Sequence, residues 1–368
     1  MSVIAIGTRK GLWLAHGGEP GQGWRMDGPH FLMNEVPSVA FGPPAAADRP
    51  PRLLVGVRSE HWGPTVARSD DLGTSWQETD QGSIQFPADT GAALARVWQL
   101  HPDPDRAGVV WAGCEPTSLW RSEDGGETFG LVRGLWDHPH RPSWAPGFGG
   151  AAVHTVVLDP ADPSRVLVAM STGGVYRSTD AGQSWSPSNL GVSAYFLPDP
   201  QPEFGQCVHK VAVDAAGLPR LYLQNHHGVY RSDDGGDSWQ SIAEGLPSDF
   251  GFVMLAHPTR PGTLWVVPLE ADARRVPPTG RLRAHRSRDG GRTWTEVGQG
   301  LPDSAYTVVL RDAASVLAPT TGDDGPATVV LGTRDGCVFV SQDDGDTFAL
   351  AADHLPDVLS VRAHPVAG

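Results

Sequence analysis

Short hydrophobic segments alternate with turn-forming residues along the whole chain. The part around His154, which begins at Val153, shows the pattern, since it reads VHTVVLDP, RVLVAMST, GVYRSTD and SWSPSN. The first three segments are rich in β-branched or aromatic residues and are bounded by Gly, Pro, Asp or Asn, which is typical of β-strands. The fourth carries fewer such residues, and helical periodicity is nearly absent. The pattern therefore predicts an all-β chain in which four antiparallel strands form one structural unit.

One motif recurs between the third and fourth strands of these units. It has the form Ser-x-Asp-x-Gly-x-Ser/Thr-Trp/Phe and occurs six times, with central aspartates Asp71, Asp124, Asp180, Asp234, Asp289 and Asp343. Successive aspartates are 53, 56, 54, 55 and 54 residues apart, and such a constant period indicates a repeat architecture. The motif lacks the ligand spacing of an EF-hand loop. We interpret it as a turn in which Asp and Ser bond the local backbone and the aromatic residue is buried.

The two ends of the chain each carry part of a further unit. VIAIGTRKGLWLA has the form of second and third strands, VLSVRAHP has that of a first strand, and HGGEPGQGW continues the period backwards with Trp24 at the aromatic position. Four-stranded units repeated radially form a β-propeller, and a blade shared by both ends would remove the open edge. We therefore predict one seven-bladed β-propeller domain over residues 1–368. Its blades comprise residues 1–30 plus 356–365, 35–80, 93–133, 150–188, 206–243, 250–298 and 304–351.

The six motif copies resemble Asp-box (BNR) repeats. The chain is similar to the sialidase-like, WD40/YVTN/BNR-like propeller superfamily over nearly its full length. This resemblance implies that the Asp boxes are structural and lie on the face away from an active site. Sialidases of the superfamily use an arginine triad, a tyrosine nucleophile and an Arg-Ile-Pro signature near the start, where this chain reads GTRKGLW. No catalytic residue is therefore carried over from them.

The composition narrows the partners that we expect. The net charge of −14 argues against a nucleic acid or an anionic membrane, which would require basic patches. The start of the sequence lacks the form of a signal peptide, and no run of residues is long and apolar enough for a membrane span. Three cysteines, Cys114, Cys207 and Cys337, do not suggest a disulfide framework. We expect a cytoplasmic protein, and a protein partner stays open.

Candidate chemistry lies at the mouth of the central channel, which the first strand of each blade lines. Aligning these strands on their shared ends, LHP, LDP and AHP, places one residue per blade at the same height: Leu359, Pro37, Arg96, His154, His209, Phe252 and Thr307. Cys207 lies two residues before His209 and therefore on the same side of its strand. The loops between second and third strands add His61, Glu115 and His226.

These residues suggest a site for a divalent transition metal, with His61, His154, His209 and His226 as ligands. Imidazole suits Zn, Cu or Fe, and a Cys207 ligand would favour Cu or Zn. In this hypothesis Arg96, Glu115, His154 and His209 are the catalytic residues. Arg96 holds an anionic group and Glu115 is the favoured carboxylate. The alternative is that the channel histidines bond only to water and to one another.

The main functional prediction is a cytoplasmic enzyme that acts on a small polar or anionic molecule by metal-assisted or acid–base chemistry of the hydrolase or lyase type. Two long loops rich in aromatic residues, 135–150 and the segment before His209, would cover such a ligand. One alternative is a glycoside hydrolase of the sialidase-like type, which needs two carboxyl groups about 5–10 Å apart. A second alternative is a non-catalytic ligand-binding or assembly scaffold. The Asp-box propellers that assist photosystem assembly are of this kind, but they carry a basic patch where this chain is acidic.

Overall fold

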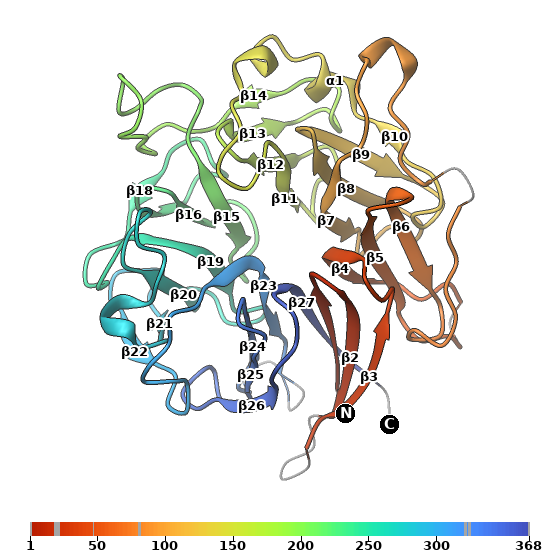
Figure 1. The fold of residues 1–368 in the computed structure, drawn as a ribbon. Coiled ribbons are helices and arrows are strands. Elements are labelled where there is room, and N and C mark those ends of the chain that lie inside the picture. Colours follow the sequence, from red (N-terminus) through yellow and green to blue (C-terminus); the bar gives the residue numbers. More distant parts are fainter. Residues whose placement is uncertain are drawn as a thin grey trace.

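The β-sheets of the protein are arranged around a common centre, as the computed structural model shows (Figure 1). The structure describes residues 2–17, 23–46, 48–79, 82–319, 322 and 325–366. The described strands form six sheets: four with four strands, one with three and one with eight. Their ladders are antiparallel except for one parallel pair. The all-β class and the four-stranded antiparallel sheets predicted from the sequence are confirmed.

The four-stranded sheets follow one another along the chain. The first contains β7 (Arg96–Pro102), β8 (Val110–Glu115), β9 (Ser118–Ser122) and β10 (Gly130–Leu131), and the second contains β11 (Val153–Leu158), β12 (Val166–Met170), β13 (Gly174–Ser178) and β14 (Ser186–Pro187). The third contains β15 (Val208–Val213), β16 (Leu221–Asn225), β17 (Val229–Ser232) and β18 (Gln240–Ser241). The fourth contains β19 (Phe250–Ala256), β20 (Leu264–Leu269), β21 (Ala284–Ser287) and β22 (Thr295–Val297). In each sheet the first strand lies nearest the centre (Figure 1).

The two ends of the chain meet in one sheet. The eight-stranded sheet has the order β26 (Ala349–Ala352), β25 (Val338–Ser341), β24 (Thr328–Thr333), β23 (Val309–Leu317), β27 (Val358–Pro365), β1 (Ser2–Thr8), β2 (Gly11–Gly17) and β3 (Arg25–His30). β27 pairs with β1 from Ser2–Pro365 to Thr8–Val358. β23 and β27 join through a single parallel pair, Asp312 and Ser360. The three-stranded sheet, β4 (Glu35–Gly42), β5 (Arg52–Ser59) and β6 (Gly63–Ser69), lies next to this one in the chain.

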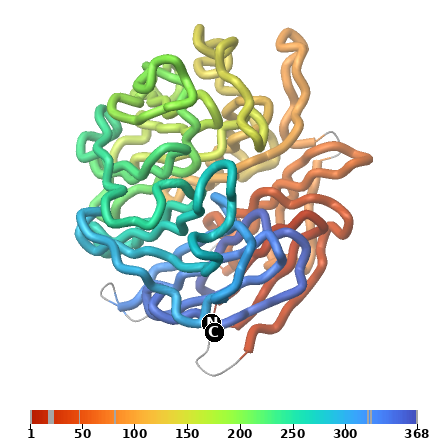
Figure 2. The backbone as a smooth tube through the Cα atoms, turned by 60° about the vertical axis from the view of Figure 1, so that its left-hand side comes forward, coloured from red at the N-terminus to blue at the C-terminus, as the bar shows by residue number. Residues whose placement is uncertain are grey.

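Helices are few and short in the described part of the chain. They are α1 (Arg133–Trp136) and three 3-10 turns, Ala88–Thr90, Arg141–Ser143 and Pro278–Gly280. None of the helices among these residues is long and apolar enough to cross a bilayer. Figure 2 shows that the segments around residues 82–95 (orange) and 133–150 (yellow) protrude beyond the sheets on one side of the ring.

The core lies between neighbouring sheets. Every residue of β12 is buried, because sheets pack against both of its faces. Trp185, the aromatic residue of one Asp box, packs in a cluster with Val168 of its own sheet and Trp111 of the preceding sheet. The expectation that this aromatic position is buried against a neighbouring sheet therefore holds for Trp185. The early repeat around Trp24 is only partly described, because residues 18–22 lie outside the described residues.

The six Asp boxes share one hydrogen-bond pattern. In each box the serine hydroxyl donates to Oδ1 of the aspartate at 2.7–2.8 Å and accepts a glycine N–H at 2.7–2.9 Å. Oδ2 of the aspartate accepts the hydroxyl of the following Ser or Thr at 2.5–2.7 Å. Both carboxylate oxygens thus bond within the turn, in agreement with the structural interpretation of the motif.

Candidate functional site

In three of the innermost strands, β7, β11 and β15, a bulge turns one residue out of the hydrogen-bonded ladder. In β7 the pairing passes from Val97 to Gln99 and leaves out Trp98. In β11 it passes from Val153 to Thr155, and in β15 from Val208 to Lys210. Bulged residues are left unpaired and the strand bends there. Trp98, His154 and His209 therefore occupy equivalent positions.

This register corrects the position predicted for Arg96. The pair Pro102–Val110 of β7 corresponds to the pair Leu158–Val166 of β11, so the shared ends LHP and LDP are offset by two residues. The residue level with His154 is consequently Trp98, whereas Arg96 begins the strand. The offset comes from the choice of end motif, because Asp103 and Asp159, rather than Leu100 and Leu158, lie at equal distances before Val110 and Val166.

A cavity of about 820 Å³ opens beside the bulge of β15. Fifteen residues line it, and the aromatic and cationic side chains among them are Phe148, Phe196, His209, His226, Phe252, Arg275 and Arg311. Phe148 and Phe196 come from the two long loops that were predicted to cover a ligand. Volumes of about 300–1,000 Å³ are usual for small-molecule sites, so this cavity is large enough to hold a ligand.

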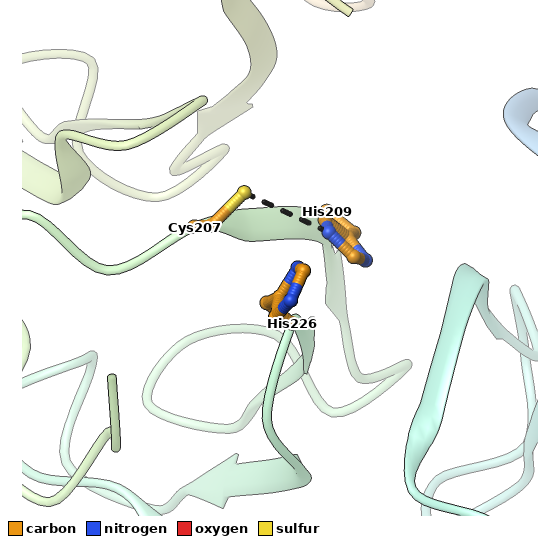
Figure 3. A group of neighbouring side chains, drawn as sticks. All are labelled: Cys207, His209 and His226. Carbon is orange, nitrogen blue, oxygen red and sulfur yellow. Dashed lines mark hydrogen bonds between the residues drawn. The ribbon is translucent and has the colours of Figure 1, made fainter. Parts of the chain in front are cut away.

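Three side chains with metal-binding atoms meet at one side of this cavity. The ligand atoms of Cys207, His209 and His226 all lie within 4.8 Å of one another (Figure 3). Sγ of Cys207 is 3.8 Å from Nε2 of His209. Burial, with Arg311 as the next contribution, holds the pKa of His209 well below its usual value, so its imidazole is neutral at neutral pH.

The other two histidines of the predicted metal set lie outside this group in the part of the chain that the structure describes. His61 is exposed in the turn between β5 and β6. His154 is fully buried, and both of its nitrogens have protein partners: Nδ1 is 3.1 Å from the hydroxyl of Thr155, and Nε2 is 2.9 Å from the carbonyl oxygen of Val208. The structure thus brings His209 and His226 together with Cys207 and keeps His154 as a packed core residue.

Arg96 and Glu115 form a second polar group next to Trp98. Nε of Arg96 pairs with Oε1 of Glu35 at 2.8 Å, and Nη1 of Arg96 is 3.9 Å from Oε2 of Glu115. The indole N–H of Trp98 donates to Glu115 at 2.9 Å. A Cβ atom on Gly150 would lie 2.5 Å from Oε1 of Glu115, so this carboxylate directly adjoins the loop that walls the cavity.

The sequence analysis missed two residues of the site, Glu35 and Arg311. The guanidinium group of Arg311 lies over the rings of Trp98 and Phe252, at 5.1 and 6.0 Å. Its Nη1 is buried and has no hydrogen-bond partner among the described residues. Arg311 belongs to the stretch of β23 that falls between the pairs of Val309 and Ala314. In the sequence, Arg311 could be recognised only as an arginine on the first strand of its unit, four residues after Thr307, the residue placed level with His154 and His209.

The repeats identify the family of the chain. Residues 176–187, which contain the box around Asp180, match the family model for the BNR/Asp-box repeat. The chain is an Asp-box (BNR) repeat protein. Among solved structures, this Asp-box protein is similar to an ancestral GH74 enzyme, with a TM-score of 0.57 and 18% identity over 95% of this chain and 39% of that one. It is also similar to YCF48 bound to a D1 peptide, with a TM-score of 0.53 and 14% identity over 89% and 83% of the two chains. These likenesses show a propeller-type fold.

Curated relatives of the Asp-box protein are named as xyloglucanases. It is 27% identical to a xyloglucanase of Hypocrea jecorina over 299 residues, which are 71% of this chain and 32% of that protein. It is 26% identical to a xyloglucanase of a Paenibacillus species over 341 residues, 80% of this chain and 30% of that one. The chain therefore spans about a third of the length of these relatives.

These matches overturn the main functional prediction. The relatives named above are xyloglucanases, which agree with the glycoside-hydrolase alternative and not with an enzyme for a small polar molecule. The prediction was wrong because it gave more weight to the channel histidines than to the carboxylates, and His154 is a core residue. The cytoplasmic location is not tested by the matches and stays a prediction.

Proposed function

We propose that the Asp-box protein binds and hydrolyses a xyloglucan-type oligosaccharide in the cavity beside β15. The observation that carries this proposal is the match to xyloglucanases, which extends over 71–80% of this chain. The cavity adds support, since sugar rings pack on aromatic faces and Phe148, Phe196 and Phe252 line its wall.

Glu115 and Glu35 are the proposed carboxyl pair. Both contact the single guanidinium group of Arg96, so they lie no farther apart than the separation of about 9.5 Å that inverting glycosidases allow. Oε2 of Glu35 also lies 3.6 Å from Nη1 of Arg9 and 3.9 Å from Nη1 of Arg58. Glu115, which adjoins Gly150 of the loop 135–150, is assigned as the general acid, and the N–H of Trp98 orients it.

We also propose that the ring has seven blades with the limits expected from the repeat. The eight-stranded sheet divides into two four-stranded blades at the single pair of Asp312 and Ser360. The three-stranded sheet gains a fourth segment through the isolated bridge between Arg68 and Gln77. With the four four-stranded sheets, this division supports one blade for each repeat of the sequence.

Hydrolysis of xyloglucan oligosaccharides, followed by the release of reducing ends, tests the proposal. Glu115→Gln should lower the rate at least about a hundredfold, because it removes a general acid but keeps the shape of the side chain. Glu60→Gln is the matched control, since Glu60 is exposed on the turn between β5 and β6. It should leave the rate unchanged.

Binding is measured separately by calorimetry. Phe148→Ala should weaken binding about fivefold, which corresponds to about 1 kcal/mol for one aromatic contact. Leu190→Ala removes another exposed hydrophobic side chain away from the cavity wall and serves as the control. Binding without hydrolysis would reject the hydrolase and leave a carbohydrate-binding protein. Absence of both would reject the proposal as a whole.

A further inference from the structure

We propose that Cys207, His209 and His226 bind one zinc ion, and that the free coordination position of this ion faces the cavity. The inference does not depend on the proposed hydrolase function. One thiol and two imidazoles form a ligand set that suits zinc and does not suit calcium or magnesium, which prefer oxygen. Three protein ligands with one open position are typical of zinc sites that act on a bound molecule.

The separations of the three side chains fit a zinc site before any metal is added. Zn–S and Zn–N bonds of about 2.3 and 2.0 Å place sulfur and nitrogen about 3.5 Å apart around a tetrahedral ion. The Cys207–His209 separation of 3.8 Å is already close to this value. The backbone N–H of His226 donates to the carbonyl of Cys207 at 2.9 Å, so the turn after β16 is fixed beside the start of β15. The ligand atoms of the three residues, which lie within 4.8 Å of one another, can therefore approach to the separations of a zinc site by movement of the side chains.

Outer hydrogen bonds prepare both imidazoles for a metal. Nδ1–H of His209 donates to the carbonyl of Gly251 at 2.6 Å, which leaves the lone pair of Nε2 on the side of Cys207. Nε2 of His226 is 3.1 Å from Oδ2 of Asp272, which reserves Nδ1 as a ligand atom. Metal-bound histidines almost always have such a carbonyl or carboxylate behind them, because it fixes the tautomer and the ring orientation.

His154 shows what the same strand position looks like without a ligand. It is equivalent to His209, yet a hydroxyl and a carbonyl oxygen of the protein lie at hydrogen-bonding distance from its two nitrogens. His209 has a carbonyl on one side and only the sulfur of Cys207, at 3.8 Å, on the other. His209 therefore has one ring nitrogen available at the cavity, whereas both nitrogens of His154 are occupied. This difference marks His209 as a binding residue and His154 as a packed one.

The charge around the site predicts the nature of the fourth ligand. A zinc ion with one thiolate carries one positive charge, which Asp272 behind His226 balances. Arg275 and Arg311 also line the cavity and add two further positive charges. An anion, either hydroxide or a carboxylate group of a ligand, is therefore the expected occupant of the open position.

The test uses the full chain without a histidine tag, freed of metal by a chelator. On addition of zinc we expect one ion per chain by elemental analysis. On addition of cobalt(II), which replaces zinc, we expect the charge-transfer absorption of a thiolate ligand. Cys207→Ser should abolish that absorption and weaken zinc binding by at least about a hundredfold. Cys337→Ser and His61→Gln change a cysteine and a histidine outside the group and should bind like the unchanged protein.

Asp272→Asn keeps all three ligands and should weaken zinc binding about 10–100-fold, so it carries the test even if a ligand variant does not fold. Failure of the unchanged protein to bind zinc overturns the inference, as does unchanged affinity in Cys207→Ser. Equal loss in the two controls also overturns it, because binding would then be unspecific. Every readout uses the metal alone, so the outcome is independent of whether the protein hydrolyses xyloglucan.

Discussion

The Asp-box turns and the bulges of the innermost strands are two sets of repeated positions that behave in opposite ways. The six boxes keep the same serine, aspartate and glycine, and the same hydrogen bonds. The bulges vary, since they carry Trp98 in one sheet and His154 and His209 in two others, and the two histidines have different partners. The residues that all six boxes share stabilise the turn, which every blade requires in order to fold. Different residues at equivalent positions mark where blades have separate tasks.

Residues that differ between blades are nevertheless not all concerned with ligands. Asp312 of β23 forms buried ion pairs with Lys210 of β15 at 2.7 Å and with Arg362 of β27 at 2.8 Å. These contacts join three innermost strands, and Lys210 directly follows His209. The comparison therefore needs experiments that separate stability from binding.

The largest effect is expected from removing β27. A chain that ends before Val358 leaves β1 paired with β2 alone and opens the ring at an edge strand. We expect a loss comparable to the whole stability of a domain, about 5–15 kcal/mol, and therefore no cooperative unfolding transition in circular dichroism. A chain that ends at Val366 keeps the strand and is the control. An unchanged melting temperature after the longer deletion would show that the two ends do not hold the ring together.

Asp312→Ala should have the next largest effect. It leaves Lys210 and Arg362 buried without their counter-charge, and the loss of one partner of such a pair costs about 3–5 kcal/mol. Chemical denaturation measures this change. Asp303→Ala also removes a carboxylate that pairs with arginine, but Asp303 is 78% exposed, so little change is expected. Equal effects of the two variants would contradict the distinction between centre and surface.

The same carboxylate predicts a dependence of stability on pH. Burial raises the pKa of Asp312, but Lys210 and Arg362 more than offset this and lower it from 3.8 to about 2. Because the pKa is lower in the folded state, the stabilisation is complete above about pH 4 and is lost as the pH falls towards 2. It amounts to about 2 kcal/mol. Urea unfolding between pH 6 and 2 should show this loss in the unchanged protein and a smaller one in Asp312→Asn.

The smallest effect is expected at an Asp box. Asp234→Ala removes the bonds from Ser232 and Ser238 and should cost about 1–2 kcal/mol without changing zinc affinity or hydrolysis. Asp124→Ala should cost the same within about 0.5 kcal/mol, because its box has the same bonds. Loss of function at full stability in either variant would mean that the boxes do more than shape turns.

The parts of the fold that depend on local chemistry could be predicted from the sequence. A serine, an aspartate and a glycine at fixed spacing suffice to form the turn, so the boxes and the strands around them were found. Pairing register depends on partner strands, and aligning the strand ends on Leu100 and Leu158 instead of on Asp103 and Asp159 gave the wrong one. For this reason Arg96 was placed level with His154, two residues from the equivalent Trp98.

The site was predicted less completely for a similar reason. His209 and His226 were named, and Cys207 was noted as a possible ligand. His61 and His154 were predicted as metal ligands alongside them. A sequence does not show which ring nitrogens already have hydrogen-bond partners, so it could not separate the four histidines. Gly251 and Asp272 bind one ring nitrogen of His209 and of His226, and both lie outside the sheet that carries these histidines.

The bulges also have a consequence for how such proteins diversify. A bulged residue contributes nothing to strand pairing, so its replacement changes the lining of the channel at little cost to the sheet. Trp98, His154 and His209 show that an indole and an imidazole are accepted at equivalent places. Natural variation or protein engineering can therefore exchange the chemistry of these positions one at a time. One ring can in this way acquire new ligands while the pairing of its strands stays the same.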